Sequence, residues 1–293
     1  MKTKLYLALF CVAFFWGTTF LGIRIGIETI PPFLLAGIRN LISGFIIFFY
    51  LLVQRKLEPI NPRQFLRAFI LALLMIVIAN GFTTYSEKYI TSGLASLIST
   101  LSPFFVLILN LILGNEKLSI KTTLGIFLGM FGIFLIYQNS ISDLLNPEYR
   151  QGVFAILLAV LSWAIGTIIT KKGSNNSLSM LMNVSVQMLI AGIILTGIQL
   201  SITPTISTEN WSLRSVFAMI YLAVFGSVVG YVAYSYLMTQ MSSTKVSVLS
   251  YVNVVVALFL GWLILDETIT SRIILAASLI IGGVFIVNYK KVK

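Results

Sequence analysis

The sequence contains no histidine and only one cysteine, Cys11, among its 293 residues. A single thiol cannot form a disulfide within the chain, and without imidazole the chain lacks the side chain that most often binds metals and transfers protons near neutral pH. No ATP-binding loop is present either. We therefore expect no metal and no other cofactor, and any work the protein performs must draw on a solute gradient.

Acidic residues are also few. The chain has nine, and none lies deep within an apolar stretch. An intramembrane enzyme needs a metal cluster, an activated nucleophile or paired carboxylates, and no H-E-x-x-H, G-x-S-x-G or paired intramembrane Asp is found. The sequence predicts that the protein is not an enzyme. The missing carboxylate also argues against simple antiport through a buried acid, which leaves facilitated diffusion or exchange.

Charged residues make up 10% of the chain, against about 25% in soluble domains. Hydrophobic residues make up 58%, and the mean hydropathy is +0.99. A spanning helix needs about 20 mostly apolar residues. Ten stretches qualify, which predicts an all-α polytopic membrane protein with spans near 5–25, 33–53, 66–86, 91–113, 122–138, 151–171, 178–200, 213–237, 243–265 and 272–289. The first apolar run is too long for a signal peptide and is expected to be a span.

The net charge of +11 is explained by orientation rather than by nucleic acid, for which we expect no binding. With a cytoplasmic N-terminus, the basic residues of the inner loops and tails are Lys2, Lys4, Arg55, Lys56, Arg63, Arg67, Lys117, Lys121, Lys171, Lys172, Lys245, Lys290, Lys291 and Lys293. The outer ends then carry only Arg24, Lys88, Arg150, Arg214 and Arg272. This positive-inside bias predicts both termini in the cytoplasm and a multi-pass protein of the cytoplasmic membrane.

The second half of the chain repeats the first. Shifting the sequence by 151 positions places "LGNEKLSIKTTLGIFLGMFGIFLI" on "ILDETITSRIILAASLIIGGVFIV", with Glu116 on Glu267 and Gly132 on Gly283. We predict one repeat over 1–138, an outer linker over 139–150 and a second repeat over 151–293. Each repeat holds five spans, an odd number, so the second enters the membrane inverted. Inverted halves are typical of transporters, whose substrate site lies near mid-membrane between them.

The chain resembles the drug/metabolite transporter superfamily, in particular the ten-helix type built from two EamA-like repeats. The resemblance rests on "FFWGTTFLGIRIGI", "AGIRNLISG", the "GNEKLS" and "LDETIT" junctions and the five-plus-five plan. It implies export or exchange of small metabolites, amino acids or drugs. It also implies that spans three, four, eight and nine line a central cavity, with spans five and ten packed outside.

Hydroxyl groups recur along one face of two apolar spans. Ser92, Ser96, Ser99 and Ser102 follow helical spacing in the fourth span, and the repeat sets them against Ser243, Ser247, Ser250 and Asn253. Two interpretations stay open: the stripes line an aqueous path, or small residues let helices pack closely. Pro103 is expected to kink the fourth span, since it removes a backbone hydrogen bond. Glu116 and Glu267 are assigned to turns, with Ser119 and Thr270 as helix N-caps.

Aromatic and charged side chains within the spans complete the candidate site. Tyr231 and Tyr234 share a helix face opposite Asn80 and Thr84, and Trp16 and Trp163 occupy equivalent places in the two repeats. Each set has two interpretations, substrate contact or interhelical packing. Arg39 either binds a substrate carboxylate, or snorkels or braces a carbonyl. The predicted substrate-binding residues are Trp16, Arg39, Asn80, Thr84, Ser96, Ser99, Trp163, Gln187, Tyr231, Tyr234, Ser247, Ser250 and Asn253.

These patterns predict a secondary transporter, an exporter or exchanger, that moves a small organic metabolite by alternating access at a cavity between the repeats. The alternatives are a membrane receptor or accessory protein that does not transport, or a carrier for nucleotide-linked or lipid-linked sugars. The expected partners are the substrate and the lipid bilayer. A homodimer stays open, because the "GIFLG" motif at 125–129 packs either within the bundle or between two copies.

Overall fold

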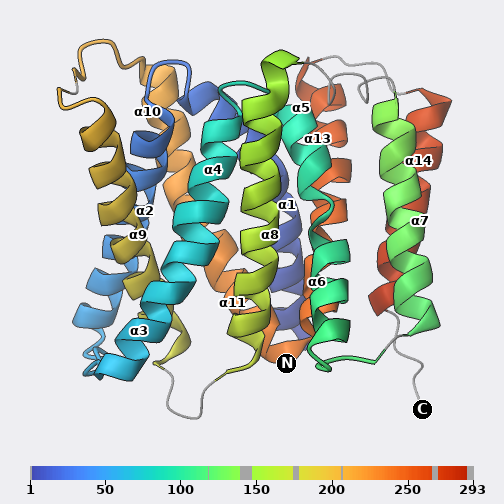
Figure 1. Cartoon of the computed structure of the whole chain (residues 1–293), viewed down its shortest axis with the longest axis horizontal. Coiled ribbons are helices and arrows are strands. Elements are labelled where there is room, and N and C mark those ends of the chain that lie inside the picture. Colours follow the sequence, from blue (N-terminus) through green and yellow to red (C-terminus); the bar gives the residue numbers. More distant parts are fainter. Residues whose placement is uncertain are drawn as a thin grey trace.

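The computed structural model describes residues 2–117, 119–138, 147–173, 178–205, 207–265 and 270–288. The helical segments of this part are α1 (Lys2–Gly26), α2 (Pro32–Val53), α3 (Pro62–Leu71), η1 (Ala72–Ile78), α4 (Ala79–Ser86), α5 (Ser92–Ser99), α6 (Ser102–Ile112), α7 (Ile120–Tyr137), η3 (Pro147–Tyr149), α8 (Arg150–Lys171), α9 (Met180–Ile202), α10 (Leu213–Tyr221), η4 (Leu222–Val229), α11 (Gly230–Gln240), α12 (Ser243–Ser247), α13 (Leu249–Leu265) and α14 (Ser271–Asn288). Within these residues the protein is all-helical (Figure 1).

Each of the ten apolar stretches coincides with one helix or with a run of consecutive helical segments. Among the described residues, eight of these are long and apolar enough to cross a membrane. The other two are shorter apolar helices, Ile120–Ile136 and Ser243–Val256. Helix α1 begins, and helix α14 ends, at the same end of the bundle, the lower end in Figure 1.

Local sequence signals set several helix starts. Asn61 and Gln64 form a capping box at the start of α3, and Thr91 caps α5 by accepting a hydrogen bond from the N–H of Leu94. Ser119 precedes α7 as predicted, but its side chain makes no capping hydrogen bond. The hydroxyl of Thr270 accepts from the N–H of Ile273 over 3.4 Å. Glu267 lies outside the described residues.

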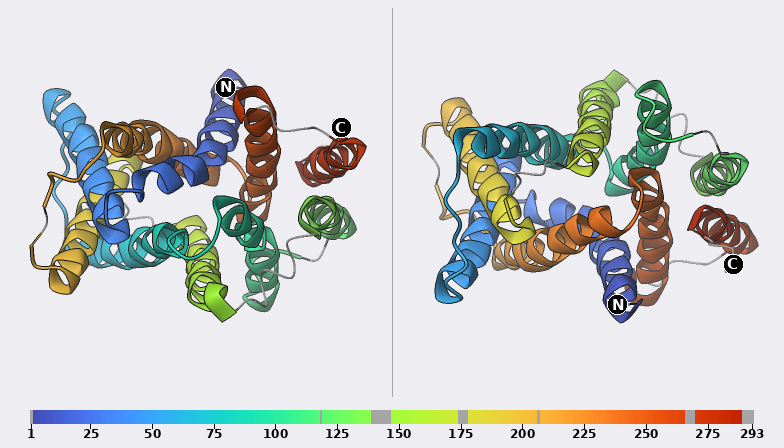
Figure 2. Two further views of the ribbon diagram at one scale, coloured as in Figure 1. Left: turned by 90° about the horizontal axis from the view of Figure 1, so that it is seen from above. Right: turned by 90° about the horizontal axis from the view of Figure 1, so that it is seen from below.

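The two halves interleave. Helix α1 of the first half packs on α10, α11 and α13 of the second, whereas α8 of the second packs on α4 and α6 of the first. Helices α2 and α9 pair at one edge of the bundle, and α7 and α14 pair at the opposite edge (Figure 2). The largest hydrophobic cluster therefore joins residues of both halves, such as Met75, Met188 and Tyr234.

Two helical runs contain a π-helical segment at equivalent places. Segment η1 joins α3 to α4, and η4 joins α10 to α11; a shift of 151 positions places Ile78 on Val229, where the two segments end. Short π segments within α-helices are frequent at functional sites. The fourth stretch is interrupted between Ser99 and Ser102, in agreement with the kink predicted at Pro103. The ninth is interrupted at Val248 without a proline.

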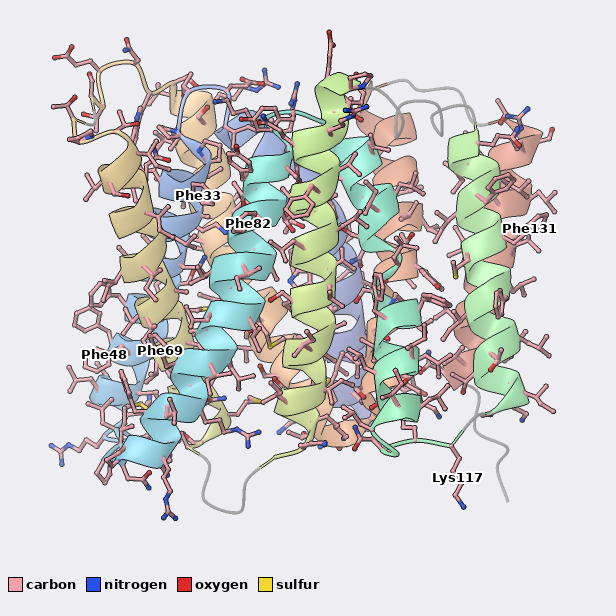
Figure 3. The ribbon with its side chains drawn as sticks, viewed as in Figure 1. Phe33, Phe48, Phe69, Phe82, Lys117 and Phe131 are labelled. Carbon is pink, nitrogen blue, oxygen red and sulfur yellow. The ribbon has the colours of Figure 1, made fainter. Side chains whose placement is uncertain are left out.

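The surface of the bundle suits a bilayer. Charged side chains gather towards its two ends, and Lys117 lies at the lower end (Figure 3). The belt between the ends exposes large apolar side chains, among them Phe49, Phe131 and Phe154. Figure 3 shows Phe131 on α7, at the edge of the bundle. In a membrane these side chains contact lipid tails.

The "GIFLG" motif packs within the bundle. A Cβ atom placed on Gly125 would lie 2.6 Å from the carbonyl oxygen of Gly283, and one on Gly283 would lie 2.5 Å from that of Gly125. Only glycine permits this approach of α7 to α14. Of the two alternatives for this motif, the structure shows packing within the bundle.

Candidate substrate cavity

A central cavity of about 170 Å³ lies where the two halves meet. Eleven of the thirteen predicted site residues line it: Trp16, Arg39, Asn80, Ser96, Ser99, Trp163, Tyr231, Tyr234, Ser247, Ser250 and Asn253. They come from α1, α2, α4 and α5 of the first half and from α8, α11, α12 and α13 of the second. The wall thus combines aromatic rings, hydroxyl groups, amides and one guanidinium.

Four aromatic rings form a contiguous wall, which we call the aromatic cluster: Trp16, Trp163, Tyr231 and Tyr234. The centroids of Trp16 and Trp163 lie 5.3 Å apart in an edge-to-face arrangement, and the ring of Tyr234 lies 5.3 Å from Trp16 and 5.0 Å from Trp163. The two tryptophans, equivalent in the repeats, therefore touch across the interface of the halves. Such rings offer an apolar face to a solute while their polar atoms bond elsewhere.

Hydrogen bonds fix the cluster. The indole Nε1 of Trp16 donates to the carbonyl oxygen of Gly226 in η4 over 3.0 Å, and the hydroxyls of Tyr234 and Thr167 lie 2.7 Å apart. Because the polar atoms of Trp16 and Tyr234 are bonded to other residues, these two rings are held in fixed positions in the cavity wall. This preorganisation lowers the entropy lost when a solute is bound.

The hydroxyl stripes face the cavity only in part. Ser96, Ser99 and Ser102 line it, whereas Ser92 does not. On the opposite wall Ser247 and Ser250 line it, but Ser243 instead accepts a hydrogen bond from the amide of Asn110 over 2.9 Å. The Ser99 hydroxyl donates to the carbonyl of Ala95, and the buried Ser250 hydroxyl has no partner among the described residues. Part of each hydroxyl stripe therefore lines the cavity, whereas Ser92 and Ser243, at the ends of the stripes, do not.

Glu116 lies in a turn, as predicted, but its side chain also links the two halves of the protein. Its carboxylate accepts hydrogen bonds from the Asn110 amide over 3.1 Å and from the Ser243 hydroxyl over 3.3 Å. The same amide nitrogen donates to the hydroxyl of Thr244 over 3.0 Å. This network links α6 of the first half to α12 of the second, a role that the turn assignment did not include.

Two predicted site residues lie outside the cavity wall. Thr84 is fully buried, and its hydroxyl donates to the carbonyl of Asn80 one turn earlier over 2.9 Å. Gln187 lines a second pocket at the lower end and accepts from the Tyr231 hydroxyl over 3.4 Å. In both cases the predicted helix is right, but the side chain points to a different neighbour.

Sequence reasoning missed several polar residues near the cavity. Thr19, Asn40 and Ser227 line it. Thr19 lies one turn after Trp16, a spacing that a helical-face search could have found. Glu87 follows the last residue of α4, beyond the predicted span 66–86, and its side chain is fully buried. The prediction that no acid lies deep within a span is not contradicted by Glu87, but it did not foresee a carboxylate buried at a helix end that is covered by protein.

Further pockets lie on either side of the central cavity. The lower one shares Met75, Tyr231 and Tyr234 with it, so the two tyrosines of the aromatic cluster and Met75 lie between the two pockets. The upper one is lined by Arg24, Glu28, Phe33 and Lys88 among others and has no lining residue in common with the central cavity. Figure 3 shows Phe33 towards the upper end of the bundle.

An apolar outer belt around a polar and aromatic cavity defines a multi-pass membrane protein that can hold a small solute. The sequence model of the EamA-like transporter family matches residues 3–138 and again 150–289. The chain belongs to this family and is a membrane transporter.

Individual relatives agree. The chain is 33% identical to the uncharacterized inner membrane transporter YedA of Escherichia coli K12, over 98% of this chain and 91% of YedA. It is 29% identical to the uncharacterized transporter YoaV of Bacillus subtilis, over 96% of each. One solved crystal structure shares the fold, with a TM-score of 0.79 and 16% identity over 98% of both chains. Together with the apolar helices, these matches place the protein in the cell membrane as a multi-pass transporter.

Proposed function

We propose that this protein is a secondary transporter that moves a small organic metabolite by alternating access at the central cavity. The proposal includes ten spans in two inverted repeats, over 1–138 and 151–293, with both termini in the cytoplasm. Three observations support it: the family model matches twice, the π segments recur at equivalent places, and α1 begins at the end where α14 finishes. The basic residues predicted for the inner side include Lys117, which lies at that same end.

The observation that carries the substrate class is the pairing of the aromatic cluster with Arg39 in one cavity. Ring faces favour the apolar part of a solute, and a guanidinium fork favours a carboxylate. Hydroxyls of Ser99 and Ser250 offer hydrogen bonds to further polar groups. We infer an amphipathic solute that carries a carboxylate, such as an amino acid or a comparable small metabolite.

Several elements of the cavity wall are candidates for the parts that bend during the transport cycle. Met75 and Ile76 of η1, and Gly226 and Ser227 of η4, line the cavity from the π segments. The interruption between α5 and α6 lies beside it, at Ser99 and Ser102. We propose that bending at these places opens the cavity towards the lower and upper pockets in turn. Interruptions at this depth are tolerated where protein or water satisfies the backbone.

Two experiments test the proposal. A thermal-stability screen of the purified protein against a metabolite panel should give hits among amphipathic carboxylates, because a bound ligand raises apparent stability by mass action. Counterflow in proteoliposomes with the best hit should then accumulate labelled solute. A ligand that stabilises the protein but never exchanges across the membrane would indicate a receptor and overturn the transport proposal.

A further inference from the structure

Three charged side chains belong to the upper half of the bundle, and one of them, Arg39, lines the central cavity. Arg24 comes from α1, Arg39 from α2, and Glu87 follows the last residue of α4. Glu87 is fully buried and Arg39 is 3% exposed, whereas Arg24 is exposed. Charged side chains are almost never buried unless they are paired, so the surroundings of Glu87 and Arg39 require an explanation.

The main chain of Glu87 is anchored, but its carboxylate is not. Arg24 Nη1 donates to the carbonyl oxygen of Glu87 over 2.5 Å. Neither carboxylate oxygen of Glu87 has a hydrogen-bond partner among the described residues, and the same is true of Nε and Nη1 of Arg39. The carboxylate is attracted electrostatically by both arginines. Glu87 is therefore a buried acid whose carboxylate has no hydrogen-bond partner in the described part of the chain, although two arginines act on it.

The two arginines belong to different pockets. Arg39 lines the central cavity, and Arg24 lines the upper pocket. Thr83, one turn before Glu87, lines the central cavity, and Lys88, which follows Glu87, lines the upper pocket. Glu87 itself is fully buried and lines neither pocket, but its neighbours in the chain border both. Its carboxylate therefore lies in the protein that separates the two pockets.

We propose that Glu87 is the internal counter-ion of Arg39, and that a solute carboxylate displaces it when the solute enters the central cavity. The inference rests on the proposed transport function. Without solute, Glu87 turns to Arg39 and closes the boundary between the pockets. With solute, the incoming carboxylate pairs with Arg39, and Arg24 retains Glu87. A neutral or cationic solute supplies no charge to replace that of Glu87, so the pair selects for anionic and zwitterionic substrates.

Cysteine labelling tests this without knowledge of the substrate. The chain would carry Cys11→Ser and Ser99→Cys, so that the only thiol lies in the cavity wall. Two membrane-impermeant methanethiosulfonates, one sulfonated and anionic and one quaternary and cationic, are applied to intact cells and to inverted vesicles. The ratio of the anionic to the cationic labelling rate is measured from each side.

Glu87→Gln should raise this ratio by about tenfold from the side of the upper pocket, because it leaves two arginines without their acid. Glu28→Gln is the matched control: it removes an exposed acid from the upper pocket and should change the ratio by less than about twofold. The double variant Arg39→Gln/Glu87→Gln, which removes both charges of the pair, should return the ratio to the parental value. Glu87→Asp should keep the parental ratio.

An unchanged ratio in Glu87→Gln, with the thiol at position 99 still reactive, overturns the counter-ion role and leaves the proposed transporter standing. If that thiol reacts from neither side in any variant, the aqueous cavity itself is absent, and the proposed function fails together with this inference. Should Glu87→Gln not reach the membrane, recovery of insertion in the double variant supports the pairing, and no recovery contradicts it.

Discussion

The hydroxyl of Ser162 in α8 donates a hydrogen bond to the carbonyl oxygen of Leu74 in η1 over 2.8 Å. The same carbonyl accepts the N–H of Ala79, five residues on, which is the π-helical pattern. At the equivalent segment η4 of the second half, the carbonyl of Ala223 accepts from the hydroxyl of Ser43 in α2 of the first half, also over 2.8 Å; this hydroxyl is shared with the carbonyl of Arg39, one turn earlier in α2. Each π segment is thus tied to a neighbouring helix by one buried serine. These side-chain hydrogen bonds anchor each π segment to the helix that packs beside it.

Replacement of Ser162 by alanine should lower the free energy of unfolding by about 0.5–1.5 kcal/mol, the net value of one hydrogen bond. Ser43→Ala should have an effect of similar size. The measurement is the thermal unfolding of the purified protein in detergent, followed by tryptophan fluorescence. Ser278→Ala is the matched control, because the exposed Ser278 hydroxyl only bonds back to Ile274 within its own helix. If Ser278→Ala destabilises the protein as much as Ser162→Ala, the hydrogen bond between Ser162 and Leu74 contributes no more to stability than a bond within one helix.

Gly283→Ala should separate α7 from α14. Its new methyl carbon would lie 2.5 Å from the carbonyl oxygen of Gly125 and 2.9 Å from the nitrogen of Gly129, and backbone atoms cannot move aside as a flexible side chain can. We expect a loss of about 1–3 kcal/mol, as for other overpacked sites. Gly197→Ala on α9 is the control, since a Cβ there meets nothing within 4 Å. Equal melting temperatures for the two variants would contradict the close approach.

Hydropathy was sufficient to locate the helices, because the length and apolarity of a span follow directly from the bilayer. The interruption after Ser99 could also be predicted, since Pro103 has a known effect on the backbone. The π segments could not, because Ala72–Ile78 has the pattern of an ordinary apolar run. Their geometry depends on partners from distant helices, such as Ser162.

The site shows the same division. The repeat and helical periodicity identified eleven of the residues that line the cavity, including Trp16 and Trp163 on equivalent helices. They could not identify Glu87, because the rule that places charges in loops takes no account of a helix end covered by other helices. Gln187 was misplaced for a related reason: its position in the seventh span did not reveal that its side chain lines the lower pocket and not the central cavity.

Arg39→Gln should abolish transport of an anionic or zwitterionic substrate and leave expression intact. A lost charged hydrogen bond weakens binding by about 1.5–3 kcal/mol, or roughly 10- to 150-fold. Arg39→Lys should retain part of the activity, because an ammonium keeps the charge but not the planar fork. Arg150→Gln, which removes an exposed arginine at the start of α8, is the control. The readout is counterflow of the metabolite found in the stability screen, and normal kinetics in Arg39→Gln would discard the substrate role.

Cysteines placed at 99 and 250 should react with water-soluble thiol reagents, whereas one placed at 278 should not. Ser99 and Ser250 line the central cavity from opposite halves, and a thiol must ionise in water before it reacts. Ser278 lies on the exposed face of α14, which contacts lipid in the membrane, so a thiol there stays protonated. In a Cys11→Ser background, labelling is followed by the mass increase of the purified protein. A bound substrate should slow the reaction at 99 and at 250 together, because one solute occupies a cavity walled by both. Protection at one position only would mean that the two hydroxyl walls do not enclose a shared site.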